Sequence, residues 1–62
     1  MKPDPTQFKG LTVQEARALL GEERRLRMAS QDGVPYVLTQ DYNPNRLNVH
    51  LVNGRITKAS YG

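Results

Sequence analysis

The chain has 62 residues, and nine lysines and arginines against six aspartates and glutamates give it a net charge of +3. This length allows one small domain, and the absence of cysteine excludes disulfides and cysteine-based zinc sites. With a single histidine, His50, and no apolar run near the roughly 20 residues that span a bilayer, we expect no metal, no cofactor and no membrane partner.

Residues 1–9 are predicted to form an extended N-terminal arm, because Pro3 and Pro5 restrict their own backbone and that of the residues before them. Phe8 is the residue expected to pack this arm against the rest of the chain. Residues 10–62 are then expected to form a single domain.

A short helix is predicted over residues 13–20. Thr12 is a good N-cap residue, and Glu15 follows at the spacing of a capping box. Gly21 fits the position just after the helix. The apolar stripe at helical spacing consists of Val13, Ala16, Leu19 and Leu20. Such a short helix would be marginal alone and must pack on something.

Two segments alternate between polar and apolar residues, which is typical of half-buried strands. The first is residues 25–29, and the second, residues 46–51, alternates more cleanly. In the second, one set is expected to face the core (Leu47, Val49 and Leu51) and the other to face away (Arg46, Asn48 and His50).

Asn53-Gly54 is a strong hairpin signal, and residues 55–59 are predicted to form the returning strand, with Ile56 as its main apolar residue. The core is expected to include Leu19, Leu20, Val49 and Leu51.

The connection over residues 30–45 is long for so small a domain, and it is too apolar for a disordered linker. A parallel pair of strands needs a crossover of about a dozen residues or more, so we predict that the strands around Leu26 and Leu47 are parallel. The alternative is an extra strand over residues 36–39 that forms a hairpin. The predicted fold class is α+β, with one short helix packed on a small mixed sheet and a long exposed binding loop.

The residue inventory argues against an enzyme. Nucleophilic catalysis needs a nucleophile beside an oriented base, and His50 lies in mid-strand with nothing nearby in sequence that marks it as one. The sequence has no glycine-rich phosphate loop and no carboxylate cluster with metal-ligand spacing.

A binding function has more support. Arg46 and Asn48 share one face of a strand just after the long loop, and Arg46 could form a charge-assisted pair with Asp41 that would fix the loop. Equally, both residues could simply decorate the sheet. Acidic residues accompany the only basic cluster, so we favour a solvated surface and expect no nucleic-acid partner; that cluster is Arg24, Arg25 and Arg27.

From Gly10 to Gly62 the chain resembles the potato inhibitor I family of serine-protease inhibitors, and especially its bacterial and fungal elastase-inhibitor-like branch. The most specific part is the run Thr39-Gln40-Asp41-Tyr42-Asn43-Pro44-Asn45-Arg46-Leu47-Asn48-Val49. It is similar in order and spacing to the reactive loop of that family and the strand after it. The opening over residues 10–16 and the ending on glycine are similar too.

The resemblance implies a protease-binding loop that consists of Leu38, Thr39, Gln40, Asp41 and Tyr42. Its reactive bond would be Gln40–Asp41, with Gln40 in the main specificity pocket of the protease. The same resemblance implies loop support from Arg46, which would hold Thr39, Asp41 and the Gly62 carboxylate, and from Asn48 through neutral hydrogen bonds. Family members present such a loop like a substrate and are hydrolysed slowly.

Three positions depart from the family pattern. Asn48 stands where plant and leech members have a second arginine. Tyr61 stands where the bacterial branch usually has a cysteine of a disulfide, and an apolar contact between Phe8 and Tyr61 is the expected replacement. Gln40 stands where strong inhibitors more often carry an apolar residue.

The function predicted from the sequence is therefore substrate-like inhibition of a subtilisin- or chymotrypsin-like serine protease by a monomer. The alternative is a non-enzymatic interaction module that binds a non-protease partner through the same loop or a sheet edge. No signal peptide is visible. The compartment stays open between the cytoplasm, for a full-length chain, and the periplasm or exterior, for a trimmed one.

Overall fold

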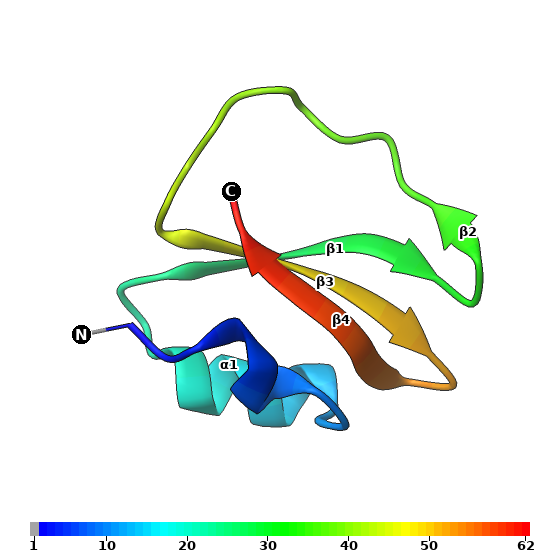
Figure 1. Cartoon of the computed structure of the whole chain (residues 1–62), viewed down its shortest axis with the longest axis horizontal. Helices are drawn as coiled ribbons and strands as arrows, with labels where there is room; N and C mark the ends of the chain where they lie inside the picture. The colour runs from blue at the N-terminus through cyan, green and yellow to red at the C-terminus, as the bar shows by residue number, and fades with distance from the viewer. Residues whose placement is uncertain (1) are drawn as a thin grey trace.

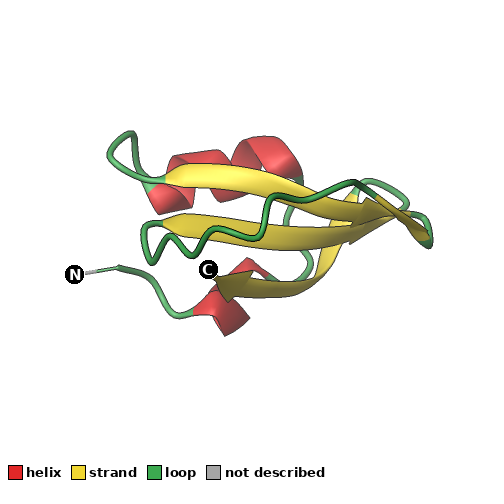
Figure 2. Cartoon of the chain, turned by 90° about the horizontal axis from the view of Figure 1, so that it is seen from above, coloured by secondary structure: helices red, strands yellow, loops and turns green. Residues whose placement is uncertain are grey.

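A computed structural model describes residues 2–62 and has the predicted α+β fold, with one α-helix on a mixed sheet (Figure 1). The sheet has four strands in the order β2-β1-β3-β4. In chain order the elements are the 3-10 helix η1 (Pro5–Phe8), helix α1 (Val13–Leu20), and strands β1 (Arg25–Gln31), β2 (Val34–Pro35), β3 (Arg46–Val52) and β4 (Arg55–Tyr61). Both helices lie on one face of the sheet, and the segment of residues 36–45 crosses the other face (Figure 2).

Helix α1 begins and ends where the sequence predicts. Thr12 Oγ1 accepts a hydrogen bond from the Glu15 amide, and Glu15 Oε1 accepts one from the Thr12 amide, which completes the capping box. Gly21, with a φ of 89°, ends the helix in a conformation that favours glycine.

Leu19 was expected in the core, but its side chain is 43% exposed, and that prediction is wrong. The buried stripe of α1 contains Ala16 and Leu20, with Val13 partly buried against the core. Because successive helical residues are about 100° apart around the axis, Leu19 projects to one side of the stripe that Leu20 completes.

Strands β1 and β3 are parallel, as predicted, and their register places Leu26 opposite Leu47 and Arg27 opposite Asn48. Strands β3 and β4 are antiparallel. Asn53 and Gly54 join them with φ values of 53° and 78°, the left-handed values of a tight hairpin turn. The alternation in β3 is also confirmed. The buried core consists of Phe8, Ala16, Leu20, Ala29, Leu47, Val49, Leu51 and Ile56.

Strand β1 departs from simple alternation. Met28 is 37% exposed, whereas Ala29 is buried. The register between β1 and β3 shifts between Met28 and Ser30, and such a bulge inserts an extra residue that breaks the period of two.

The long connection combines both predicted alternatives. The chain turns at Asp32-Gly33 and pairs β2 antiparallel to β1, so a hairpin exists, but its strand is Val34–Pro35 rather than residues 36–39. The amide of Tyr36 donates a last hydrogen bond to the Ala29 carbonyl. Residues 36–45 then carry the chain across to the parallel strand β3.

The N-terminal arm is not extended throughout, because residues 5–8 form η1, with Asp4 accepting a hydrogen bond from the Thr6 amide as its N-cap. Phe8 is fully buried and anchors the arm, as expected. Tyr61 packs against the core that contains Phe8. Among the residues described, no helix has the length and hydrophobicity that a membrane span requires.

Tyr61 also fastens the arm through polar contacts that the sequence did not suggest. Its hydroxyl donates a hydrogen bond of 2.7 Å to the Pro3 carbonyl, and Lys2 Nζ lies 4.5 Å from the centre of its ring. Burial raises the pKa of Tyr61, which keeps this hydroxyl protonated as a donor.

Candidate functional site: the exposed loop and its supports

The loop presents its side chains to solvent. Every residue from Gln31 to Tyr42 is exposed, and residues 36–43 adopt no regular secondary structure. Val37 is fully exposed and Tyr42 is 77% exposed. Exposed apolar side chains that cluster on one segment are typical of an interaction surface. All five residues expected to form the binding loop, residues 38–42, lie on this segment.

Arg46, the first residue of β3, binds Asp41 and Gly62 together. Its Nη2 donates to the Asp41 carbonyl at 2.7 Å, its Nη1 lies 3.3 Å from Asp41 Oδ2, and its Nε donates to Gly62 O at 3.0 Å. The Arg46 side chain is only 11% exposed, so the guanidinium is held beneath the loop. The pairing of Arg46 with Asp41 and Gly62 is the one that the resemblance implied.

Asp41 is held in its ionised form. Hydrogen bonding by the Thr39 side chain lowers the pKa of Asp41 most, followed by a backbone amide and the nearby Arg46 guanidinium. The carboxylate is therefore charged at neutral pH and forms a charge-assisted contact with Arg46.

Thr39 is bound by a residue that the sequence prediction did not include. Arg27 Nη1 donates to Thr39 Oγ1 at 2.9 Å and to the Thr39 carbonyl at 3.4 Å. Arg46 was expected to hold Thr39 as well as Asp41, but its guanidinium contacts lie with Asp41 and Gly62. The register of the parallel strands explains the difference, because it brings Arg27 beside Asn48 and within hydrogen-bond distance of Thr39.

Asn48 uses both ends of its side-chain amide. Its Oδ1 accepts from Arg27 Nε at 2.7 Å, and its Nδ2 donates to Gly62 O at 2.9 Å. Gly62 O thus accepts from Asn48 and Arg46, and the Gly62 amide donates to the Arg46 carbonyl. One polar network on the sheet under the loop therefore consists of Arg27, Arg46, Asn48 and Gly62.

The C-terminal end of the loop is also fixed. Asn43 Oδ1 accepts from the Asn45 amide at 2.9 Å, and the Asn43 carbonyl accepts from the Arg46 amide at 3.1 Å. Lys2 Nζ donates to the Pro44 carbonyl at 2.7 Å. The arm therefore reaches the point where the loop enters β3.

His50 has a partner that the sequence did not reveal. Ser30 Oγ lies 2.7 Å from His50 Nδ1, where β1 and β3 pair side by side. Among residues 2–62, that is the one side-chain hydrogen bond of the His50 ring, so the pair lacks the third group that orients a catalytic base. In the same residues, no cluster of three or more metal-ligating side chains occurs.

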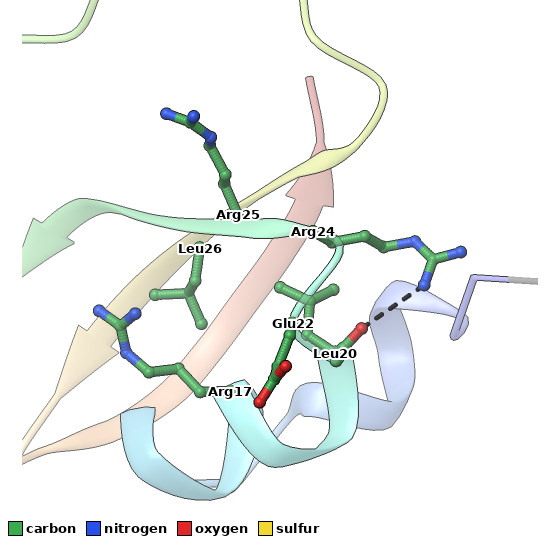
Figure 3. Close-up of a pocket in the computed structure, with 7 residues that line it drawn as sticks. Arg17, Leu20, Glu22, Arg24, Arg25 and Leu26 are labelled. Atoms are coloured by element: carbon green, nitrogen blue, oxygen red, sulfur yellow. Dashed lines mark hydrogen bonds between the residues drawn. The ribbon is translucent and has the colours of Figure 1, made fainter.

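A pocket of about 560 Å³ lies where α1 gives way to β1, and its lining residues are Arg17, Leu20, Gly21, Glu22, Arg24, Arg25 and Leu26. Figure 3 shows the guanidinium groups of Arg17, Arg24 and Arg25 pointing in different directions. Arg24 Nη1 is directed to the Leu20 carbonyl at the end of the helix, 3.5 Å away. These basic groups therefore do not converge on one anion position.

Comparisons with models of protein families, with curated proteins and with solved structures gave no match for this chain.

Proposed function

We propose that the protein is a substrate-like inhibitor of a subtilisin- or chymotrypsin-like serine protease, with Gln40–Asp41 as the reactive bond. One observation carries this proposal. The residues on both sides of Gln40 are bound to guanidinium groups of the sheet, Thr39 to Arg27 and Asp41 to Arg46. Gln40 itself is exposed and makes no side-chain hydrogen bond within residues 2–62.

This arrangement favours binding because the loop is ordered in advance. A flexible loop must be ordered when it enters a protease cleft, at a cost of roughly 0.5–1.5 kcal/mol for each side chain that is immobilised. The contacts to Thr39 and Asp41 place that ordering in the free protein. Gln40 then projects between two fixed neighbours and is available to a specificity pocket.

The same contacts favour slow hydrolysis. The protease attacks the Gln40 carbonyl carbon, and the peptide bond to the Asp41 nitrogen must break. Arg46 holds the Asp41 carbonyl as well as the carboxylate, so the newly formed Asp41 amine would stay beside the acyl group and could re-form the bond. A loop without such contacts would separate after cleavage and behave as a substrate.

The resemblance to the potato inhibitor I family supports the proposal from the sequence side. It implies a helix packed on a small mixed sheet, a reactive loop before a strand, and a basic residue on that strand. Residues 36–45 lead into β3, whose first residue is Arg46, and this order agrees with the implied one.

The experiment is a titration against subtilisin-, chymotrypsin- and trypsin-like proteases, with mass spectrometry of the cleavage products over time. Wild type should inhibit at least one of them and be cut slowly at Gln40–Asp41. Arg46→Ala should bind more weakly, roughly tenfold for the loss of a charge-assisted hydrogen bond, and should be cut faster at that bond.

Arg17→Ala is the matched control, because it removes a guanidinium from an exposed position on α1 away from the loop. It should behave like wild type. Equal cleavage rates for wild type and Arg46→Ala would contradict the support role of Arg46.

A second candidate is an interaction module for a non-protease partner. The exposure of Val37 and Tyr42 favours it, because apolar side chains on a protruding segment suit protein contacts in general. This alternative would replace the first if no serine protease in the panel engaged the loop.

A further inference from the structure

We infer that Arg27 is a second loop-positioning residue, and that two arginines divide the loop between them at the reactive bond. Arg27 fixes the side that ends with Gln40, and Arg46 fixes the side that begins with Asp41. This inference rests on the proposed function for its kinetic consequences, whereas its structural part can be tested without any protease.

The contacts of Arg27 are those of a positioning residue. One nitrogen, Nη1, reaches both the hydroxyl and the carbonyl of Thr39, at 2.9 and 3.4 Å. The Nε of the same planar group is bound to Asn48 at 2.7 Å. Because the guanidinium is rigid and planar, the bond to Asn48 sets the direction in which Nη1 meets Thr39.

Cleavage between residues 40 and 41 would separate the two pairs of residues. Arg27 and Thr39 would belong to one fragment, and Arg46 and Asp41 would belong to the other. Each cut end keeps a guanidinium from its own fragment. Holding an end in place therefore does not require the other fragment's arginine.

The two fragments are joined elsewhere. The parallel pairing of β1 with β3 runs between them, and the Arg25 amide donates to the Asn45 carbonyl at 3.1 Å. The bond from Arg27 to Asn48 is a side-chain link across the same boundary. The polar network thus connects Arg27 to Arg46 and also helps to hold each guanidinium in place.

Arg27 and Arg46 should act at different stages of the reaction. In acylation, the serine oxygen of the protease bonds to the Gln40 carbonyl carbon, the bond to the Asp41 nitrogen breaks, and that nitrogen leaves as an amine after taking a proton. Arg27 orders Thr39 and Gln40 before the attack, so it should govern affinity. Arg46 orders Asp41 and also retains the leaving amine, so its loss should weaken binding and, unlike the loss of Arg27, should raise the rate of net hydrolysis.

The structural test is nuclear magnetic resonance relaxation of labelled wild type, Arg27→Ala and Arg27→Lys. In Arg27→Ala, the order parameters at Thr39 and Gln40 should fall from about 0.85 to below about 0.6, the values of rigid and flexible backbone. Asp41 should change less. Lysine can keep only one of the two contacts at a time, so Arg27→Lys should be intermediate.

Arg25→Ala is the matched control on the same strand, two residues away and exposed, and it should leave the loop unchanged. If Arg27→Ala perturbs the signals of β3 and β4, Thr39→Val provides the second variant, since it removes the hydroxyl without altering the sheet. It is judged at Thr39 and Gln40 only, because the same hydroxyl also bonds to Asp41. Unchanged order at Thr39 in a folded Arg27→Ala, or equal loosening at Asp41, would overturn the inference.

The kinetic test uses a protease that wild type inhibits. Arg27→Ala should raise the dissociation constant roughly tenfold with little change in kcat for cleavage at residues 40–41, whereas Arg46→Ala should raise that kcat. If both variants raise kcat alike, the division between the anchors is wrong. If wild type inhibits no protease, the proposed function fails, and the relaxation result still decides the role of Arg27.

Discussion

The main-chain amide of Asn53 donates a hydrogen bond of 2.8 Å to Oδ1 of Asp32, and this bond ties the turn after β3 to the turn after β1. The Asp32 amide in turn donates to the Leu51 carbonyl at 2.8 Å. Both turns lie at the same end of the sheet (Figure 1), and their first residues have left-handed φ values of 51° and 53°. One carboxylate therefore joins the two hairpins.

Asp32→Gly should lower the free energy of unfolding by about 0.5–1.5 kcal/mol, the usual contribution of one hydrogen bond. Glycine accepts the left-handed backbone but offers no acceptor, and it also gives the unfolded chain more freedom. Asp32→Asn keeps a neutral acceptor and tolerates the same backbone, so its loss should be smaller. Urea denaturation would measure both, and equal midpoints for wild type and Asp32→Gly would contradict this role.

The core gives a prediction on the adjacent residues Leu19 and Leu20 and on Val49 of β3. Leu20→Ala should cost about 2–5 kcal/mol because it removes a buried side chain, and Val49→Ala should cost somewhat less because fewer atoms are lost. Leu19→Ala, at a position 43% exposed, should cost well under half as much as Leu20→Ala. Chemical denaturation of the three variants tests this order, and an unchanged midpoint for Val49→Ala would show that the face of β3 is misassigned.

Gln40→Leu and Gln40→Met should tighten inhibition of a subtilisin- or chymotrypsin-like protease. A glutamine amide that enters an apolar pocket loses water and must find new partners, whereas leucine and methionine do not. Inhibition constants for the three proteins would measure the effect, with Gln7→Leu as a control at an exposed position in η1. If neither substitution at position 40 changed inhibition, the reactive bond would lie elsewhere.

The loop should loosen in acid. Hydrogen bonding by the Thr39 side chain, a backbone amide and Arg46 lower the pKa of Asp41 below its ordinary value of 3.8. A lowered folded-state pKa means that the contribution of ionised Asp41 is complete above that ordinary value and is lost as the pH falls through the lower one. Order parameters of residues 39–42 should therefore hold from neutral pH to about pH 4 and decline below it.

Asp41→Asn is the control for this pH dependence, because an amide does not titrate there. Backbone hydrogen bonds also lower the pKa of Asp4 and of Glu15, at Thr6 and Thr12 respectively, so overall stability should fall in the same range. Residue-by-residue order separates the loop from that general loss. A loop equally ordered at pH 6 and pH 2.5, with the sheet still folded, would contradict the prediction.

The elements that the sequence predicted are those specified by short-range signals. Thr12 and Glu15 define the start of α1 within one turn, the alternation of β3 appears in consecutive residues, and Asn53-Gly54 specifies its own turn. Each of these signals lies within a few residues of the structure it produces. None of them depends on which strand lies alongside.

The structure departs from the sequence patterns where the packing of a neighbouring element determines which side chains are buried. The exposure of Met28 follows from a shift in the pairing of β1 with β3, which cannot be seen in β1 alone. Leu19 lies at the side of the buried stripe of its helix, so its burial depends on how α1 sits on the sheet.

The candidate site likewise contains one contact that the sequence could predict and one that it could not. Asp41 and Arg46 are five residues apart and could be paired from the sequence. Arg27 is twelve residues from Thr39 and on another strand, so only the register between β1 and β3 reveals it. Once Leu26 is matched with Leu47, Arg27 falls opposite Asn48.

The contact between Pro3 and Tyr61 has a consequence for the connectivity of the molecule. It brings the two ends of the described chain together through a hydrogen bond of 2.7 Å. Cleavage of one peptide bond within residues 36–45 would divide the chain into two fragments, and the contact between Pro3 and Tyr61 would still join them. In the nicked protein, this hydrogen bond would still connect the fragment that contains Pro3 to the fragment that contains Tyr61.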